Sequence, residues 1–282
     1  MSVTAGIDVG SSYTKVVLVN EGDQMLGRCM KPTGFKLAEV SETTFRDCLS
    51  KAGINKNDVH YVVATGIGRH QVVFKDVHVT DLTASARGCK LLFPNTRTVL
   101  DVGGQTMKAS RLDDTAKVLS FRMNDKCAAG TGAFLEKTAR YMGFTTKEIG
   151  ALLATSKEPV SISGVCAVFA ESEVINHLSL GVAPADIMLG AVESLVARSV
   201  QLVRRVKAEP EFTLIGGIMR FNTMAQAVRE QLKSEVNVPP EDMVQFVTAL
   251  GAAILGQRRL KKLSEMDASG SVVSSSTMQG TS

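Results

Sequence analysis

The stretch "GIDVGSSYTKVVLV" (residues 6–19) decides the fold, because "LDVGGQTMKASRL" (residues 100–112) repeats its pattern later in the chain. Each stretch predicts a strand, a tight turn of small residues and a second strand, which together form a β-hairpin. The aligned pairs are Asp8 with Asp101, Gly10 with Gly103, and Lys15 with Lys108. Either hairpin alone would be an ordinary structural feature, but two that match predict a repeated functional element.

Both turns have the chemistry of a phosphate site. Backbone N–H groups exposed in such a turn form a nest that binds anions. In the first stretch Ser11, Ser12 and Thr14 add hydroxyl donors, and Lys15 adds a positive charge. Facing each other across a cleft, the two hairpins would hold a polyphosphate from both sides. Asp8 and Asp101 would then hold Mg²⁺, mainly through its water ligands. Neither stretch is a Walker A loop, since no GxxxxGK[ST] occurs.

A third signal is "FTLIGGIMRF" (residues 212–221), an apolar strand followed by Gly216-Gly217 and then by a helical pattern from Asn222 to Ser234. Two glycines between a strand and a helix permit the close approach of a flat ligand. The double glycine follows the two predicted phosphate hairpins along the chain, and the three motifs in this order predict a nucleotide site.

These three motifs resemble those of the acetate kinase/sugar kinase/Hsp70/actin superfamily. The resemblance implies an α/β fold of two similar ribonuclease H-like (actin-type) domains with a nucleotide cleft between them, and an adenosine site at Gly216 and Gly217. We expect the first domain at residues 1–95 plus 244–262, the second at 96–243, and a disordered serine-rich tail at 263–282.

Two of the five cysteines stand out by their position. Cys127 precedes "AAGTGAFLEKTARYMG" and Cys166 precedes "AVFAESEVINHL", both of which have helical periodicity. A thiolate at a helix N-terminus has a lowered pKa and can ligate metal. A [4Fe–4S] cluster takes four thiolates, so two from each of two chains would complete one. Cys29, Cys48 and Cys89 are expected to be buried packing residues instead.

The hairpins and the two cysteine motifs together resemble the activator ATPases of 2-hydroxyacyl-CoA dehydratases and the ATPase subunits of ATP-dependent benzoyl-CoA reductase. This resemblance implies a cluster shared by two ATPase chains, with ATP hydrolysis driving an electron toward a partner protein. The reductase is the favoured interpretation and implies a related ATPase subunit as heterodimer partner, two acyl-CoA-binding subunits and a ferredoxin donor. The alternative is a dehydratase activator, which would be a homodimer. After the double glycine, the family pattern leads us to expect small or uncharged residues around the adenosine. This chain has Arg220-Phe221 there instead.

In the expected mechanism, the phosphates are bound by Gly10, Ser11, Ser12, Thr14, Lys15, Gly103 and Gly104. Gln105 is the candidate that positions the attacking water, as a glutamine does in other nucleotide hydrolases. Loss of the γ-phosphate would remove contacts shared by both domains, so the cleft would open and move the cluster relative to its partner.

Two other classes of protein remain open. A small-molecule kinase would use Asp101 as a base but leaves the cysteines unused, and an actin-like assembly protein would use ATP only to set its conformation. The four-residue basic cluster near residues 258–262 favours a solvated helix end over a nucleic-acid site. The longest apolar runs are too short to span a membrane and no signal peptide is evident, so we expect a cytoplasmic protein.

Overall fold

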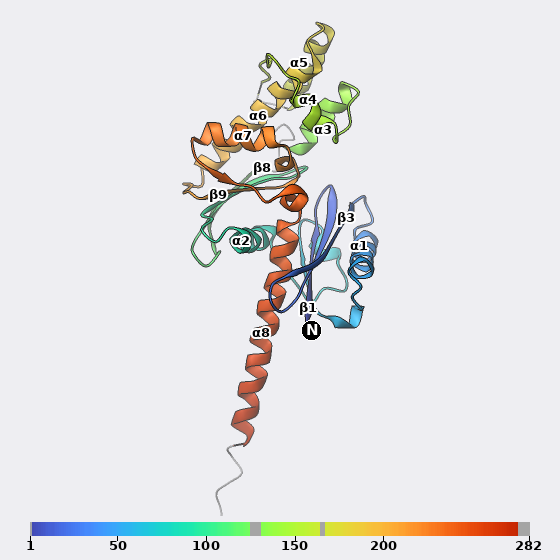
Figure 1. Cartoon of the computed structure of the whole chain (residues 1–282), viewed down its shortest axis with the longest axis vertical. Helices are drawn as coiled ribbons and strands as arrows, with labels where there is room; N and C mark the ends of the chain where they lie inside the picture. The colour runs from blue at the N-terminus through green and yellow to red at the C-terminus, as the bar shows by residue number, and fades with distance from the viewer. Residues whose placement is uncertain (1, 125–130, 164–166, 276–282) are drawn as a thin grey trace, which may run out of the picture. The chain divides into compact units, whose positions relative to one another are not determined.

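The chain forms two compact units. The computed structural model describes residues 2–124, 131–163 and 167–275. Unit 1 consists of Met1–Gly88 and Thr248–Ser282, and unit 2 of Cys89–Val247 (Figure 1). In the described part of the chain, no helix is both long and apolar enough to cross a bilayer.

Unit 1 is built on a five-stranded mixed sheet in the order β3-β2-β1-β4-β5. The three strands β1, β2 and β3 form an antiparallel meander, and β4 and β5 add in parallel to β1. The bounds are Val3–Val9 for β1, Tyr13–Val19 for β2, Met25–Pro32 for β3, Val59–Thr65 for β4 and Val77–His78 for β5.

Side chains along β1 point alternately to the two faces of this sheet, and a helix packs on each face. Ile7 and its odd-numbered neighbours pack in one cluster with Phe45 and Leu49 of α1 (Leu37–Ala52). The opposite face meets α8 (Val247–Ser275), where Thr4 Oγ1 donates to the Ala253 carbonyl at 2.8 Å. Gly6 also lies on this face, and a Cβ there would overlap the Ala249 carbonyl oxygen. Small residues are therefore required where α8 crosses β1.

Unit 2 repeats this architecture strand for strand. Its sheet has the order β10-β9-β6-β7-β8, in which β6, β7 and β8 form the antiparallel meander and β9 and β10 add in parallel to β6. The bounds are Thr98–Val102 for β6, Met107–Leu112 for β7, Val118–Asn124 for β8, Phe212–Ile215 for β9 and Val236–Asn237 for β10. The fold class predicted from the sequence, α/β with two similar domains, is confirmed.

The repeat extends beyond the stretches that are alike in sequence. The register shifts between Leu18 and Val19 in the first sheet, and between Arg111 and Leu112 at the corresponding place in the second. Both meanders therefore carry the same irregularity at the end of their second strand.

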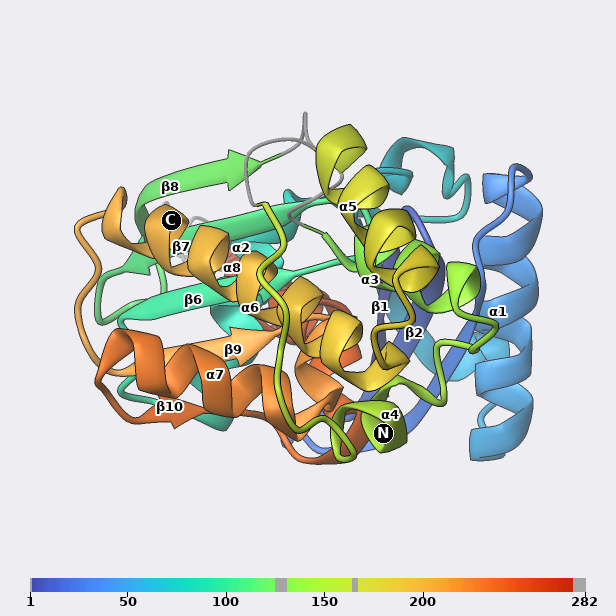
Figure 2. The ribbon, with the colours of Figure 1, turned by 90° about the horizontal axis from the view of Figure 1, so that it is seen from above.

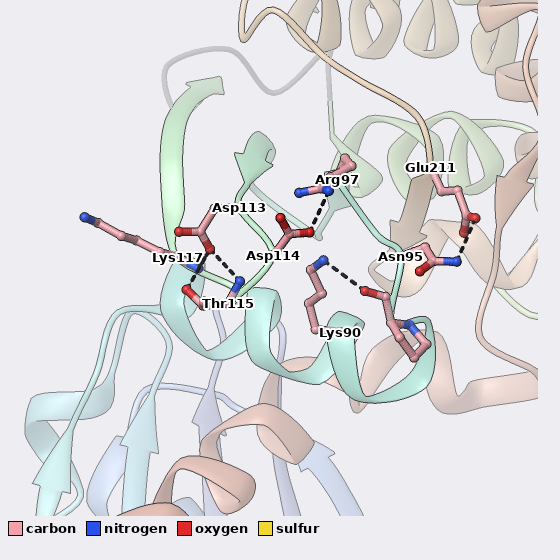
Figure 3. Close-up of polar contacts among 9 residues, drawn as sticks. Lys90, Asn95, Arg97, Asp113, Asp114, Thr115, Lys117 and Glu211 are labelled. Carbon is pink, nitrogen blue, oxygen red and sulfur yellow. Dashed lines mark hydrogen bonds and ion pairs between the residues drawn. The ribbon is translucent and has the colours of Figure 1, made fainter.

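The next turn is also built alike in both units. Asn20 Oδ1 accepts hydrogen bonds from the backbone N–H groups of Gly22 and Gln24, each at 3.0 Å. Asp113 Oδ1 accepts them from Thr115 and Lys117, each at 2.8 Å (Figure 3). These bonds hold the pKa of Asp113 below its usual value, with the Lys117 N–H as the main cause. An Asx side chain thus closes the turn in each repeat.

Helices cover the second sheet on the side where α6 lies along β6, β7 and β8 (Figure 2). The largest core cluster joins α6 to the sheet and to the helices around it, with Leu135, Ile187, Leu195 and Leu214 fully buried. The helices of unit 2 are α3 (Gly132–Tyr141), α4 (Ile149–Leu153), α5 (Ala167–Ser179), α6 (Pro184–Arg204) and α7 (Asn222–Leu232). Pro184 occupies the first turn of α6, as the sequence predicts. A further helix, α2 (Asp81–Leu92), spans the division between the two units.

The C-terminal segment differs from the sequence prediction. We expected the last helix to end near residue 262 and a disordered tail from 263, whereas α8 continues to Ser275. The divisions between the units lie at Gly88 and Thr248, a few residues from the expected boundaries.

Candidate functional site

Hairpin one, formed by β1 and β2, presents its turn at Gly10–Ser12. Asp8 pairs with Lys15 across the two strands, and Lys15 Nζ donates to Asp8 Oδ2 at 3.0 Å. The Gly10 N–H bonds to the Tyr13 carbonyl at 3.1 Å, which closes the turn. A Cβ on Gly10 would lie 2.9 Å from that carbonyl oxygen and 3.0 Å from Lys15 Nζ. The turn therefore requires glycine at this position.

A threonine that the sequence pattern did not reveal fixes this turn from the neighbouring strand. Thr33, directly after β3, donates its hydroxyl to the Gly10 carbonyl at 2.8 Å and its backbone N–H to the Ser12 carbonyl at 2.9 Å. Thr14 lies fully buried, 3.0 Å from the Thr33 hydroxyl. Thr14, predicted as a phosphate donor, thus bonds inside the unit. Only the three-dimensional pairing of β2 with β3 brings Thr33 here, so no local pattern could have identified it.

Hairpin two, formed by β6 and β7, has the same construction. Asp101 pairs with Lys108 in register, and the Gly103 N–H bonds to the Thr106 carbonyl at 2.9 Å. Gln105 lies exposed on the turn. Among the described residues, no hydrogen bond occupies the backbone N–H groups of Ser11, Ser12, Gly104 or Gln105. Each turn therefore offers unoccupied amide donors, which fits the chemistry of a phosphate ligand.

A glycine with positive φ packs behind the aspartate of each hairpin. Gly66 follows β4 with φ +86°, and a Cβ there would lie 2.5 Å from Asp8 Oδ1. Gly216 follows β9 with φ +99°, and a Cβ there would lie 2.7 Å from Asp101 Oδ1 and overlap the Val102 carbonyl. The sequence pattern identified Gly216 but not Gly66, because no double glycine marks it. Both glycines hold an aspartate carboxylate in place by close approach of the backbone.

The strand, double glycine and helix predicted at residues 212–234 are present. Gly216 donates its N–H to the Val244 carbonyl at 2.8 Å, and a short 3₁₀ turn, Gly217–Arg220, leads into α7. Arg220 is exposed, with its guanidinium 5.0 Å from the centroid of the Phe221 ring. Arg220 therefore stacks on its own neighbour, while Gly216 and Gly217 are both half-buried.

Hairpin two is bonded directly to the start of α3. Gly132 and Ala133, the first two residues of the helix, donate their N–H groups to the carbonyls of Gly103 at 3.0 Å and Gly104 at 2.8 Å. The first N–H groups of a helix have no partner within it. Here the turn of hairpin two supplies the partners that an N-cap side chain would otherwise give. Thr131, which precedes Gly132, is the first described residue after the segment that carries Cys127.

Cys127 and Cys166 lie outside the described residues, so the structure gives no geometry for them. The other three cysteines are free and buried, as predicted. Burial raises the pKa of the Cys48 thiol, and burial with the nearby Asp101 carboxylate raises the pKa of Cys89. Within the described part of the chain, no group of three or more His, Cys, Asp or Glu side chains is placed to hold a metal ion.

The chemistry of the described thiols bears on the predicted cluster site at Cys127 and Cys166. The described helices α3 and α5 begin at Gly132 and Ala167, so each begins within a few residues of one of these cysteines. Buried thiols with raised pKa values, such as those of Cys48 and Cys89, are poor ligands, because a metal binds the thiolate. Cys48 and Cys89 therefore suit a cluster poorly, and Cys127 and Cys166 stay the predicted ligands.

The chain is similar in sequence to known proteins over most of its length. The chain is 36% identical over 251 residues to the 2-hydroxyisocaproyl-CoA dehydratase activator of Clostridioides difficile, and the match covers 89% of this chain and 93% of that protein. It is 35% identical over 278 residues to a benzoyl-CoA reductase subunit of Thauera aromatica, covering 94% and 97%.

A solved structure is equally similar. The activator of the 2-hydroxyisocaproyl-CoA dehydratase from Clostridium difficile with bound ADPNP superimposes with a TM-score of 0.87 at 34% identity, covering 94% of this chain and 97% of that one. The family description "BadF/BadG/BcrA/BcrD ATPase family" matches residues 5–256, and the chain belongs to this ATPase family.

Proposed function

We propose that this chain hydrolyses ATP to drive the delivery of a low-potential electron from a [4Fe–4S] cluster that it shares with a second ATPase chain. The observation that carries the proposal is the pair of hydrogen bonds from Gly132 and Ala133 to the turn of hairpin two. These bonds join a predicted phosphate loop to the helix that follows Cys127. A change at the γ-phosphate would therefore act directly on a cysteine-bearing segment.

The proposed ATP contacts come from both hairpins. The free amides at Ser11, Ser12, Gly104 and Gln105 would bind phosphate oxygens, and Lys15 would offset their negative charge. Asp8 and Asp101 would hold Mg²⁺ through water ligands, which suits the reluctance of this ion to lose its water. Thr14 and Thr33 would act through the Gly10 turn. The backbone at Gly216 and Gly217 would lie against the adenosine.

The exposed Gln105 side chain would orient the attacking water toward the γ-phosphorus, and the bond to the β-phosphate oxygen would break to leave ADP and phosphate. When bound by Cys127, Cys166 and two thiolates of the partner chain, the cluster would supply a one-electron redox centre. The proposal includes a cytoplasmic location, with a ferredoxin as electron donor.

Two partner systems are candidates. We propose first the ATPase subunit of a benzoyl-CoA reductase, paired with a related ATPase subunit and two acyl-CoA-binding subunits. In support, the similarity to the benzoyl-CoA reductase subunit of Thauera aromatica extends over 94% of the chain. The second candidate is the activator of a 2-hydroxyacyl-CoA dehydratase, as a homodimer, supported by the 36% identity to such an activator.

The native complex, isolated without oxygen, distinguishes the two. A reductase predicts copurification with a different ATPase chain and with ATP-dependent reduction of benzoyl-CoA. An activator predicts a homodimer that confers ATP-dependent dehydration of a 2-hydroxyacyl-CoA on its partner. A colourless protein that phosphorylates a sugar would support the kinase alternative, and a colourless polymer would support the assembly alternative.

Gln105→Ala tests the ATPase step. ATP hydrolysis and electron delivery should fall in the same proportion while the iron content is unchanged. Gln226→Ala, which changes an exposed glutamine on α7 that bonds Glu230, is the matched control and should change neither rate. A variant that hydrolyses ATP slowly but delivers electrons at the normal rate would overturn the role of Gln105.

A further inference from the structure

The two helices that follow the cysteine segments are joined to each other by one acidic side chain. Lys137 of α3 lies 2.6 Å from Glu171 Oε2 of α5, and the Tyr141 hydroxyl of α3 donates to the same oxygen at 3.4 Å. Lys137 Nζ also lies 5.8 Å from the centre of the Tyr141 ring. The helices are neighbours in both views of the chain (Figures 1 and 2).

The three groups form a unit with defined geometry. The Glu171 side chain is 22% exposed and Lys137 is 49% exposed, so the contact is only partly screened by water. The hydrogen bond to Glu171 is the main cause that raises the pKa of Lys137. On either side of this contact, Thr138 and Ala139 of α3 and Ala170 and Val174 of α5 are buried in unit 2. The triad therefore lies at the edge of a packed helix pair.

Each helix is also bonded to the segment beside it. The first turn of α3 is held by hairpin two through Gly132 and Ala133. On α5, Glu173 accepts a hydrogen bond from the backbone N–H of Ser163, which lies in the segment leading to Cys166. The contacts run without a break from the turn of hairpin two, along α3, across Glu171 and along α5 to Ser163.

We infer that Glu171 is a positioning residue that makes α5 follow α3 when the nucleotide bound at hairpin two changes. Without Glu171, α3 and α5 would be joined by packing in the core alone. With it, an ion pair also links the two helices that follow the cysteine segments. The inference rests on the proposed function, because it takes hairpin two to bind ATP and the segments beside α3 and α5 to hold the cluster.

Hydrogen–deuterium exchange of the full chain, with ADP or with the analogue ADPNP, measures this coupling directly. In the wild type, the nucleotide should change the exchange of amides in hairpin two, in α3 and in α5. In Glu171→Gln the response of hairpin two and α3 should remain, while the response of α5 should fall about twofold to fivefold, the range expected for losing a partly exposed ion pair.

Two further variants exclude a merely structural role. Glu136→Gln makes the same chemical change on α3. It removes only an ion pair within that helix, between Glu136 and Arg140 at 3.4 Å. The response of α5 to the nucleotide should therefore be unchanged. The double variant Lys137→Glu, Glu171→Lys reverses the pair and should restore the response that either single change removes.

The outcomes separate this inference from the proposed function. A nucleotide response in hairpin two that never reaches α5, or that survives Glu171→Gln at full size, overturns the inference and leaves ATP binding intact. No response of hairpin two in the wild type overturns ATP binding there, and the inference with it. Iron content, measured on the same samples, tests the cluster independently.

Discussion

Thr33 Oγ1 donates a hydrogen bond to the carbonyl oxygen of Gly10 at 2.8 Å, so a residue beyond β3 sets the conformation of the turn between β1 and β2. The same hydroxyl lies 3.0 Å from Thr14 Oγ1. Both threonines are buried. The turn of hairpin one is therefore fixed by a polar contact that depends on the strand order of unit 1.

Thr33→Val should weaken both the unit and its turn. The change keeps the shape but removes the hydroxyl, leaving the Thr14 hydroxyl buried without this partner, at a cost of about 1–3 kcal/mol in the free energy of unfolding. Affinity for ATP, measured by calorimetry, should fall as well. Thr43→Val on the exposed face of α1, where the hydroxyl bonds Glu39, is the control and should keep full affinity. Unchanged affinity in Thr33→Val would contradict the role given to Thr33.

Gly10→Ala should impair nucleotide binding with little loss of fold. The added Cβ would meet the Tyr13 carbonyl at 2.9 Å and Lys15 Nζ at 3.0 Å, and so would displace the Lys15–Asp8 pair. Gly22→Ala, in the turn at the other end of β2, has only the Asn20 side chain 3.5 Å away. ATP affinity should fall in the first variant and be retained in the second. Equal affinities would argue against hairpin one as a phosphate site.

Gly216→Ala should destabilise unit 2 strongly. Positive φ and overlap with the Val102 carbonyl combine there, with an expected cost of about 2–4 kcal/mol. Gly143→Ala separates the two causes, because Gly143 has φ +80° but no atom within 4 Å of an added Cβ. The control should lose only about 1 kcal/mol. Urea unfolding, monitored by circular dichroism, measures the free energy of unfolding of both variants. Similar losses of stability in the two variants would show that the close approach of Gly216 to β6 is unimportant.

Asp113 should contribute stability that depends on pH. Its pKa is lowered from the usual 3.8 by hydrogen bonds from Lys117 and Thr115, so the folded state favours the charged form. That contribution is present above the unfolded pKa and is lost as the pH falls through the lower folded value. Between neutral pH and about pH 3, the wild type should therefore lose more stability than Asp113→Asn.

The Asp113→Asn variant should fold well at neutral pH, because Asn20 closes the equivalent turn in unit 1. Asp113→Ala lacks the acceptor and should be less stable than both. Urea unfolding midpoints of the three proteins at neutral pH and at about pH 3 measure these differences in stability. A pH dependence that is identical in the wild type and Asp113→Asn would mean that the turn carries no titrating contribution.

Motifs that are local in sequence were predictable, and contacts between distant segments were not. The Asp-Val-Gly pattern and the strand with Gly216-Gly217 each lie within a short stretch, so their structures follow from turn chemistry and periodicity. Thr33 and Gly66 reach the site only through strand pairing. The link from Gly103 to Gly132 depends on where the chain returns to hairpin two after β8.

The pair Lys137 and Glu171 shows the same limit. Each residue has the spacing of an ordinary solvated helix position, and only the packing of α3 against α5 brings them together. The equivalence of Asn20 and Asp113 was also hidden, because two different residue types perform the same function in the turn. The extension of α8 to Ser275 was not predicted, because the serine-rich segment lacks the periodicity by which a helix is recognised in the sequence.

Iron analysis of protein purified without oxygen tests whether Cys127 and Cys166 anchor half of a shared [4Fe–4S] cluster. We expect roughly two irons per chain in the wild type. The double variant Cys127→Ser, Cys166→Ser should hold no cluster iron, and the buried control Cys89→Ala should hold the full amount. A wild type without iron, or a double variant that keeps its iron, would show that these two cysteines do not hold such a cluster.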